Sequence, residues 1–155
     1  MPPHNLTETD SHLESFLHAP IIDLLGFSIH VNDDETVTVT MPVDRRHHNP
    51  MGSVHGGIAC TLADAAMGLT FSRTLLPKQT FATVELKMNF IRPVVETTLY
   101  AHGKLIRRGM RVGFLECELT DGRRKLVGTA SCTCLITDTS AVSYTHLRAH
   151  ETRPY

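Results

Sequence analysis

The stretch His55-Gly-Gly-Ile-Ala-Cys-Thr-Leu-Ala-Asp-Ala-Ala-Met-Gly-Leu-Thr-Phe-Ser72 decides the fold, because it is apolar on every side of a helix. A helix of this kind is normally buried. Between Arg46 and Arg73 the chain carries one formal charge, Asp64, in the middle of the stretch. Ionised side chains are rarely buried without a partner, and the stretch contains no basic residue. Asp64 is therefore expected to be buried or to face a cavity, and catalysis is one reason for a carboxylate there.

Composition predicts one soluble domain of ordinary type. The 155 residues are 41% hydrophobic and 20% charged, and the net charge of -1 gives no sign of a nucleic-acid partner. No apolar run is long enough to span a bilayer, and no secretory signal is evident, so a cytoplasmic protein is expected. The cysteines lack C-x-x-C spacing and are expected to be reduced thiols, in neither a disulfide framework nor a zinc site: Cys60, Cys117, Cys132 and Cys134.

The two ends of the chain differ from its middle. Residues 1–12 are polar, with two prolines, and are expected to be disordered. Residues 139–155 lack strand alternation and resemble a translated adaptor or vector tail, so a non-native or disordered tail is expected. His146 and His150 in this tail have i, i+4 spacing that can suit a metal, but the origin of the tail argues against such a site. The remaining residues, 13–138, form the predicted domain.

Periodicity and turn signals predict an α+β fold, with an antiparallel sheet that packs around one long helix. The expected helices are a short one from Ser11 to Leu25, broken at Pro20, and a long one from about Gly56 to Leu76, ended by Pro77. A hairpin is expected before the long helix and four strands after it. The predicted strands are Phe27 to Val31, Thr36 to Met41, Thr83 to Ile91, Thr97 to Ile106, Arg111 to Leu119 and Lys125 to Ile136.

The residues that lead into the long helix favour an anion or a developing oxyanion. Gly56 and Gly57 permit close approach to the backbone, and the helix N-terminus offers free N–H groups at the positive end of its dipole. Asp64 lies about 12 Å further along the helix. Simpler interpretations stay open, since the glycines can serve tight packing and His55 can cap the helix. A metal on His47, His48 and His55 is disfavoured, because zinc-ligand spacing is missing.

In these residues the chain resembles the hotdog-fold acyl-CoA thioesterases of the PaaI-like, phenylacetate-pathway type, in the 4HBT superfamily. The resemblance rests on Asn49, on His55-Gly56-Gly57 and on Leu62-Ala63-Asp64, with the amide seven residues before the first glycine and the acid eight residues after it. The segment Thr83 to Pro93 resembles the family's strand after the helix. The resemblance covers about residues 20 to 137 and implies a hotdog fold.

The resemblance implies a role for each matching residue. Asp64 would be the general base or nucleophile in thioester hydrolysis, and the Gly56 N–H would polarise the carbonyl. Asn49 would hold the water or the leaving sulfur, and His55 would order the loop. Thr83 would orient water. No cofactor is expected apart from coenzyme A as part of the substrate. The family's sites lie at the interface of a dimer with one continuous sheet, and a tetramer of two such dimers is common.

Expected substrate contacts come from the helix and from basic residues at strand ends. Gly57, Met67 and their small apolar neighbours would accept an aromatic or medium-chain acyl group. The phosphates of coenzyme A call for basic residues, and the candidates are Arg92, Arg107 and Arg108, each of which can equally be ordinary solvated charge.

One site residue fits the strand pattern poorly. Strict alternation places Thr83 opposite Val84, Leu86, Met88 and Phe90, and therefore away from Asp64. A bulge, a later strand start or a contribution to the partner's site would resolve this conflict.

Two alternatives to a thioesterase remain. A hydratase or dehydratase of the same fold usually pairs an acid with a catalytic histidine, whereas here Gly-Gly follows the histidine. A non-catalytic acyl-CoA binding protein is the second alternative, and the intact set of Asn49, Gly56 and Asp64 argues against it.

Overall fold

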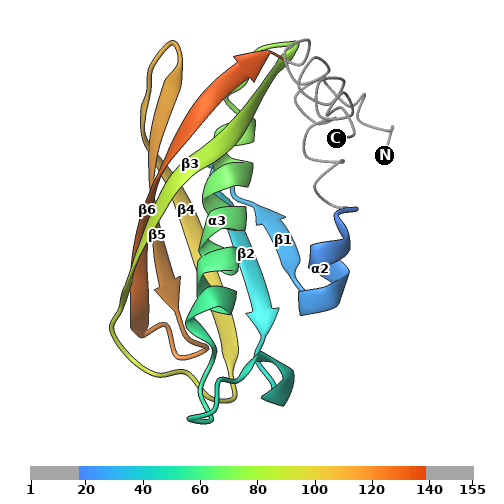
Figure 1. Ribbon diagram of the computed structural model, residues 1–155, viewed down its shortest axis with the longest axis vertical. Helices are drawn as coiled ribbons and strands as arrows, with labels where there is room; N and C mark the ends of the chain where they lie inside the picture. Colours follow the sequence, from blue (N-terminus) through green and yellow to red (C-terminus); the bar gives the residue numbers. More distant parts are fainter. Residues whose placement is uncertain (1–17, 139–155) are drawn as a thin grey trace, which may run out of the picture.

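The computed structural model describes residues 18–138, in which an antiparallel sheet curves around one long helix, α3 (Figure 1). The strand order is β1-β2-β4-β5-β6-β3, so β1 and β3 are the two edges of the sheet. This arrangement confirms the predicted α+β fold. The elements are α2 (Pro20–Leu25), β1 (Ser28–Val31), β2 (Val37–Pro42), η1 (Arg45–His47), α3 (Gly56–Ser72), β3 (Gln79–Phe90), β4 (Thr98–Arg108), β5 (Val112–Thr120) and β6 (Leu126–Asp138).

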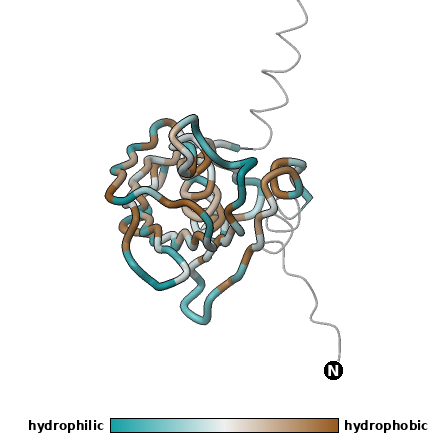
Figure 2. The backbone as a smooth tube through the Cα atoms, turned by 90° about the horizontal axis from the view of Figure 1, so that it is seen from below, coloured by the Kyte–Doolittle hydropathy of each residue, from teal (hydrophilic) through white to brown (hydrophobic). Residues whose placement is uncertain are grey.

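The core lies between α3 and the concave face of the sheet. In the end-on view of Figure 2 the chain encircles α3, and α2 stands to one side. Small residues let the helix approach the sheet closely, since a Cβ on Gly103 of β4 would lie 2.3 Å from the carbonyl oxygen of Ala66. Leu62, Ala66 and Met67 have no exposed surface. Close packing therefore fixes both the height and the rotation of α3 over the sheet.

Helix α3 ends at Ser72, four residues before the predicted end at Leu76. The hydroxyl of Ser72 donates to the carbonyl of Leu69 at 2.7 Å, and that of Thr74 donates to the carbonyl of Phe71 at 2.8 Å. These bonds satisfy carbonyls that a further helical turn would otherwise occupy. The chain then leaves the helix in tighter turns, in which the N–H groups of Thr74 and Leu75 donate to the carbonyls of Phe71 and Ser72.

Strand β3 departs from the predicted alternation. Its register with β6 shifts between Thr83 and Glu85, which marks a β-bulge. The bulge turns Thr83 toward α3, and it leaves Val84 56% exposed. Strict alternation, which placed Val84 on one face with Leu86, Met88 and Phe90, is therefore wrong for Val84. The other three keep a common face, and the Phe90 ring lies over Gly56 of α3.

The first described helix, α2, begins at Pro20, where the sequence predicted a break. Proline suits the first turn of a helix because its missing N–H has no intrahelical partner there. Of the rest of that predicted helix, residues 18 and 19 are not helical, and residues 11–17 lie outside the described residues. The expected disordered segment 1–12 and the expected tail 139–155 also lie outside them. None of the helices in residues 18–138 is long and apolar enough to cross a membrane.

Candidate functional site

Asp64 and Thr83 form a hydrogen-bonded pair between α3 and β3. The Thr83 hydroxyl donates to Asp64 Oδ1 at 2.9 Å, and no cation contacts the carboxylate within residues 18–138. Asp64 is half-buried and lines two cavities. The sequence-based expectation of a carboxylate that faces a cavity is met by this position.

Two thiols lie behind this pair on β6. Cys134 Sγ is 4.0 Å from Thr83 Oγ1 and 3.9 Å from Cys132 Sγ. Both thiols are buried, and the pKa of Cys132 is raised by its contact with Cys134 and by burial. The same contact lowers the pKa of Cys134, so the Asp64–Thr83 pair is backed by buried sulfur and not by a basic side chain.

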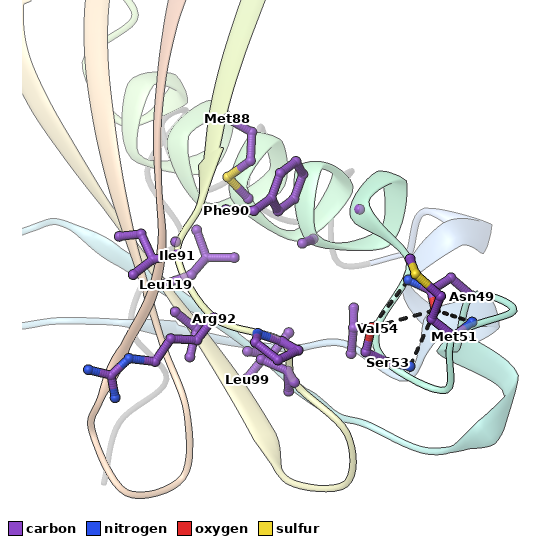
Figure 3. Close-up of a pocket in the computed structure, with 16 residues that line it drawn as sticks. Asn49, Met51, Ser53, Val54, Met88, Phe90, Ile91, Arg92, Leu99 and Leu119 are labelled. Carbon is purple, nitrogen blue, oxygen red and sulfur yellow. Dashed lines mark hydrogen bonds between the residues drawn. The ribbon is translucent and has the colours of Figure 1, made fainter.

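The loop before α3 uses the side chain of Asn49 for its own structure. Asn49 Oδ1 accepts hydrogen bonds from the N–H groups of Met51 at 2.9 Å and Ser53 at 3.3 Å, and Asn49 Nδ2 donates to Ser53 Oγ at 3.2 Å (Figure 3). Gly52 closes the turn in a left-handed conformation, with φ of 78°. Asn49 thus holds the loop, which is a role beyond the contact with water or sulfur that was expected.

His55 caps α3, and this cap occupies the N–H of one of the two glycines that follow it. His55 Nδ1 accepts a hydrogen bond from the Gly57 N–H at 2.9 Å, so this donor is occupied. Within residues 18–138 the Gly56 N–H has no hydrogen-bond partner. A Cβ on Gly56 would lie 2.9 Å from Cζ of Phe90, so a larger residue here would push this ring aside. Gly56 therefore offers the free donor that the sequence analysis expected at the helix start.

Gly56 and Asp64 line different cavities. Asn49 and Gly56 share one of about 430 Å³ with Met88, Phe90 and Arg92 (Figure 3). Asp64 and Thr83 line a second, apolar cavity of about 330 Å³ beneath α2. They also line a shallow one beside Cys60 and Glu85. One protomer therefore does not bring the proposed carbonyl-polarising group and the proposed base together.

The three candidate arginines lie at two ends of the molecule. Arg92 lines the cavity of Gly56, across from Asn49 (Figure 3). Arg108 lies near the start of β3, where its Nη2 donates to Gln79 Oε1 at 3.0 Å, and Arg107 is its neighbour in β4. Since β3 runs from Gln79 to Phe90 beside Gly56, Arg107 and Arg108 are remote from Gly56 in the same protomer.

Met67 does not lie at a cavity. It is fully buried against the sheet and lines none of the cavities described above. The expectation that Met67 contacts substrate is therefore corrected. The residues of α3 that line the cavity with Asp64 are Thr61, Ala65, Gly68 and Leu69, of which the first three have the i−3, i+1 and i+4 positions of one helix face.

Three histidines near the site each have a backbone partner. His47 Nδ1 accepts from the Asp44 N–H at 3.1 Å, His48 Nε2 lies 3.0 Å from the carbonyl oxygen of Val95, and His55 caps α3. No group of three or more metal-ligating side chains occurs in residues 18–138. These histidines therefore shape the loop before α3.

Sequence reasoning missed Phe81 and the residues of α2 that line the apolar cavity with Asp64. Phe81 lies two positions before Thr83, and its face follows only when the bulge is known. For α2 the sequence does offer an indication. Ile21 and Ile22 are apolar residues in a segment too short to form a core of its own, so they are expected to pack against another element.

Comparisons with known proteins agree with this architecture. The sequence profile of the Thioesterase superfamily (4HBT) matches residues 51–128. A Pseudomonas aeruginosa protein named "Putative esterase" is 33% identical over 118 residues, which cover 75% of this chain and 87% of that protein. A 1,4-dihydroxy-2-naphthoyl-CoA hydrolase of Listeria monocytogenes is 23% identical over 114 residues, which cover 74% and 93% respectively.

Solved structures share the fold. A Haemophilus influenzae thioesterase has a TM-score of 0.77 and 23% identity, covering 89% of this chain and 94% of that chain. The PaaI protein of the E. coli phenylacetic acid degradation operon has a TM-score of 0.74 and 22% identity, covering 84% and 95%. The solved structures show the fold, whereas the profile match and the Pseudomonas relative show the family. This chain therefore belongs to the thioesterase superfamily, and its fold is the hotdog fold.

Proposed function

We propose that this protein hydrolyses an aromatic or medium-chain acyl-CoA to the free acid and coenzyme A. The observation that carries the proposal is the Asp64–Thr83 pair, an acid that a hydroxyl orients and that two cavities expose. A thioester carbonyl is already electrophilic, so one carboxylate and one N–H donor can serve where an ester would need more. Asp64 acts as the general base that activates water, or as the nucleophile.

The carbonyl oxygen binds at the N-terminus of α3. Among the described residues the Gly56 N–H is free, and the helix dipole adds positive potential at this point. His55 and Asn49 act indirectly, because their hydrogen bonds fix the first residues of α3 and the loop before them. The expected roles of Gly56 and His55 in the reaction are thus compatible with the geometry.

The proposed site is completed by a second protomer. Gly56 and Asp64 are separated by about 12 Å of helix, which is too far for one thioester group to contact both. Strand β3 is a sheet edge of 12 residues, and pairing with its own copy would make one continuous sheet. An antiparallel pair would bring the Phe90 end of one β3, with Gly56 beneath it, toward Thr83 and Asp64 of the partner.

The same pairing would bring all three candidate arginines into one region of the dimer. The Gln79 end of β3, which holds Arg108, would lie beside the partner's Gly56 and Arg92. Phosphate groups are bound well by several guanidinium groups together. We therefore assign the phosphates of coenzyme A to Arg92 of one protomer and to Arg107 and Arg108 of the other.

The test is thiol release from a panel of acyl-CoA thioesters, with wild type compared with Asp64→Asn. We expect the variant to lose at least about a hundredfold in kcat, the scale of general-base catalysis. Asp33→Asn, in the exposed turn between β1 and β2, is the matched control and should keep the wild-type rate. Equal rates for Asp64→Asn would remove Asp64 from the mechanism.

The panel also separates the alternatives. Tight binding of acyl-CoA without thiol release would favour the non-catalytic binding protein. Addition of water to an enoyl-CoA, without thiol release, would favour the hydratase.

A further inference from the structure

The cavity beneath α2 is apolar except at one end. Its walls come from both edges of the sheet, since Phe27 and Ile29 precede or lie in β1 and Phe81 and Thr83 lie in β3. Helix α2 covers it with Ile21 and Ile22, and the polar side chains in its lining are Thr61, Asp64 and Thr83. A volume of about 330 Å³ is small among ligand cavities, which range from about 300 to 1,000 Å³.

On the side away from the start of α3, the cavity is bounded by Gly68 and Leu69 of the helix and by Phe81 of β3. Gly68 lies one helical turn beyond Asp64, about 6 Å along the axis. A Cβ on Gly68 would lie 3.1 Å from Cζ of Phe81, so the ring rests directly on the helix backbone. A chain that enters beside Asp64 would therefore meet Phe81 after about one helical turn.

The Phe81 ring is held in place by packing behind it. Phe71 and Phe81 make an edge-to-face pair, with centroids 5.5 Å apart and an interplanar angle of 89°. Phe71 is fully buried, and a Cβ on Gly113 of β5 would lie 2.1 Å from it, so Phe71 fills the space that this glycine leaves. At this end of the cavity the Phe81 ring is therefore backed by a fully buried ring, which opposes its displacement by a longer ligand.

We propose that Gly68 and Phe81 set the length of the acyl group, so that compact aryl-acyl and medium-chain thioesters are accepted and long straight chains are rejected. This inference rests on the proposed function, since the acyl group lies in the cavity whose polar end is the catalytic carboxylate. Gly68 leaves the last space that the acyl group can use, and Phe81 is the stop.

Two substitutions that act in opposite directions test the proposal. We measure kcat/KM for phenylacetyl-, butyryl-, hexanoyl-, octanoyl-, lauroyl- and palmitoyl-CoA. Gly68→Ala should lower the ratio of octanoyl to butyryl activity by about tenfold or more, the effect of one methyl group in a tight apolar pocket. Phe81→Leu should raise the ratio of lauroyl to hexanoyl activity by a similar factor. Phe114→Leu, on the exposed outer face of β5, is the matched control and should change neither ratio.

Ratios between substrates are measured on the same enzyme preparation, so a loss of folded protein does not alter them, and Tm is recorded for each variant. Unchanged ratios in both variants, with thiol release intact, would overturn this inference and leave the proposed function standing. A wild type that releases no thiol from any of the six substrates would overturn the proposed function and this inference together.

Discussion

Asp64 keeps one carboxylate oxygen free of protein donors in the described part of the chain. Oδ1 accepts from Thr83, whereas no hydrogen bond reaches Oδ2. The exposed carboxylates of Asp44 and Asp121 differ, because each accepts hydrogen bonds from at least two donors. Asp64 therefore combines a fixed orientation with an oxygen that can accept a proton from water, which is the arrangement that a general base needs.

Removal of the Thr83 hydroxyl should weaken this orientation. We expect Thr83→Val, which keeps the shape of the side chain, to lower kcat by about tenfold to a hundredfold, since hydrogen bonds to charged groups contribute about 1.5–3 kcal/mol. Thr83→Ser keeps the donor and should retain most of the activity. Steady-state kinetics on both variants checks this. A Thr83→Val enzyme with wild-type kcat would show that the hydroxyl has no part in the reaction.

The site residues could be predicted from sequence to different extents. The position of Asp64 at a cavity follows from one charge on an apolar helix, and the cap at His55 follows from its place before two glycines. The orientation of Thr83 could not be derived, because a bulge is set by pairing with β6 and leaves Thr83-Val84 looking like ordinary alternating sequence. The burial of Met67 depends on the rotation of α3, which a helix apolar on all sides does not reveal.

Among the elements, η1 anchors the start of the site. Asp44 caps it through the N–H of Arg46 at 2.9 Å, and the carbonyl of His47 accepts from the N–H of His55 at 2.8 Å. The sequence predicted only a loop here, since three residues of 3-10 helix are too few to show a period. The loop from Asn49 to Gly56 is thus tied at both ends, by η1 and by the cap of α3.

This capping should make stability depend on pH. Hydrogen bonds from the Arg46 side chain and backbone lower the pKa of Asp44 from 3.8 to about 2. A carboxylate with a lowered folded pKa stabilises fully above its unfolded value, and the contribution is lost as the pH falls through the folded value. The difference in Tm between wild type and Asp44→Asn should therefore be largest above about pH 5 and shrink toward pH 2.

Calorimetry across this range provides the measurement. Asp23→Asn, in α2, is the control, and its Tm difference from wild type should not follow this trend. A Tm difference for Asp44→Asn that stays constant from neutral to acidic pH would contradict the assignment.

At the scale of the whole molecule, the two edge strands of the sheet differ in how well they could pair with a strand of another chain. Strand β1 has four residues, whereas β3 has twelve and carries exposed Val84 and Phe90. A long edge with apolar side chains is a template for pairing with another chain. We therefore propose β3 as the edge through which the protein forms its dimer. The list of predicted strands could not identify this edge, because the order of the strands in the sheet was not known.

A charge on this edge should remove association and activity together. We expect Val84→Lys to shift the protein to monomer in size-exclusion chromatography with light scattering, and to lower thiol release in parallel. Phe114→Lys, a similar change on the outer face of β5, should leave both unchanged. A Val84→Lys monomer with full activity would refute the shared site.

The bulge at Thr83 also affects how related chains should be aligned. It inserts one residue into β3, so an insertion or deletion of a single residue in this strand exchanges the side chain that faces Asp64 for one that faces solvent. Two homologues can therefore align without a gap in this strand and still place different side chains beside the carboxylate. Transfer of a functional residue from one member to another needs the strand face as well as the aligned position.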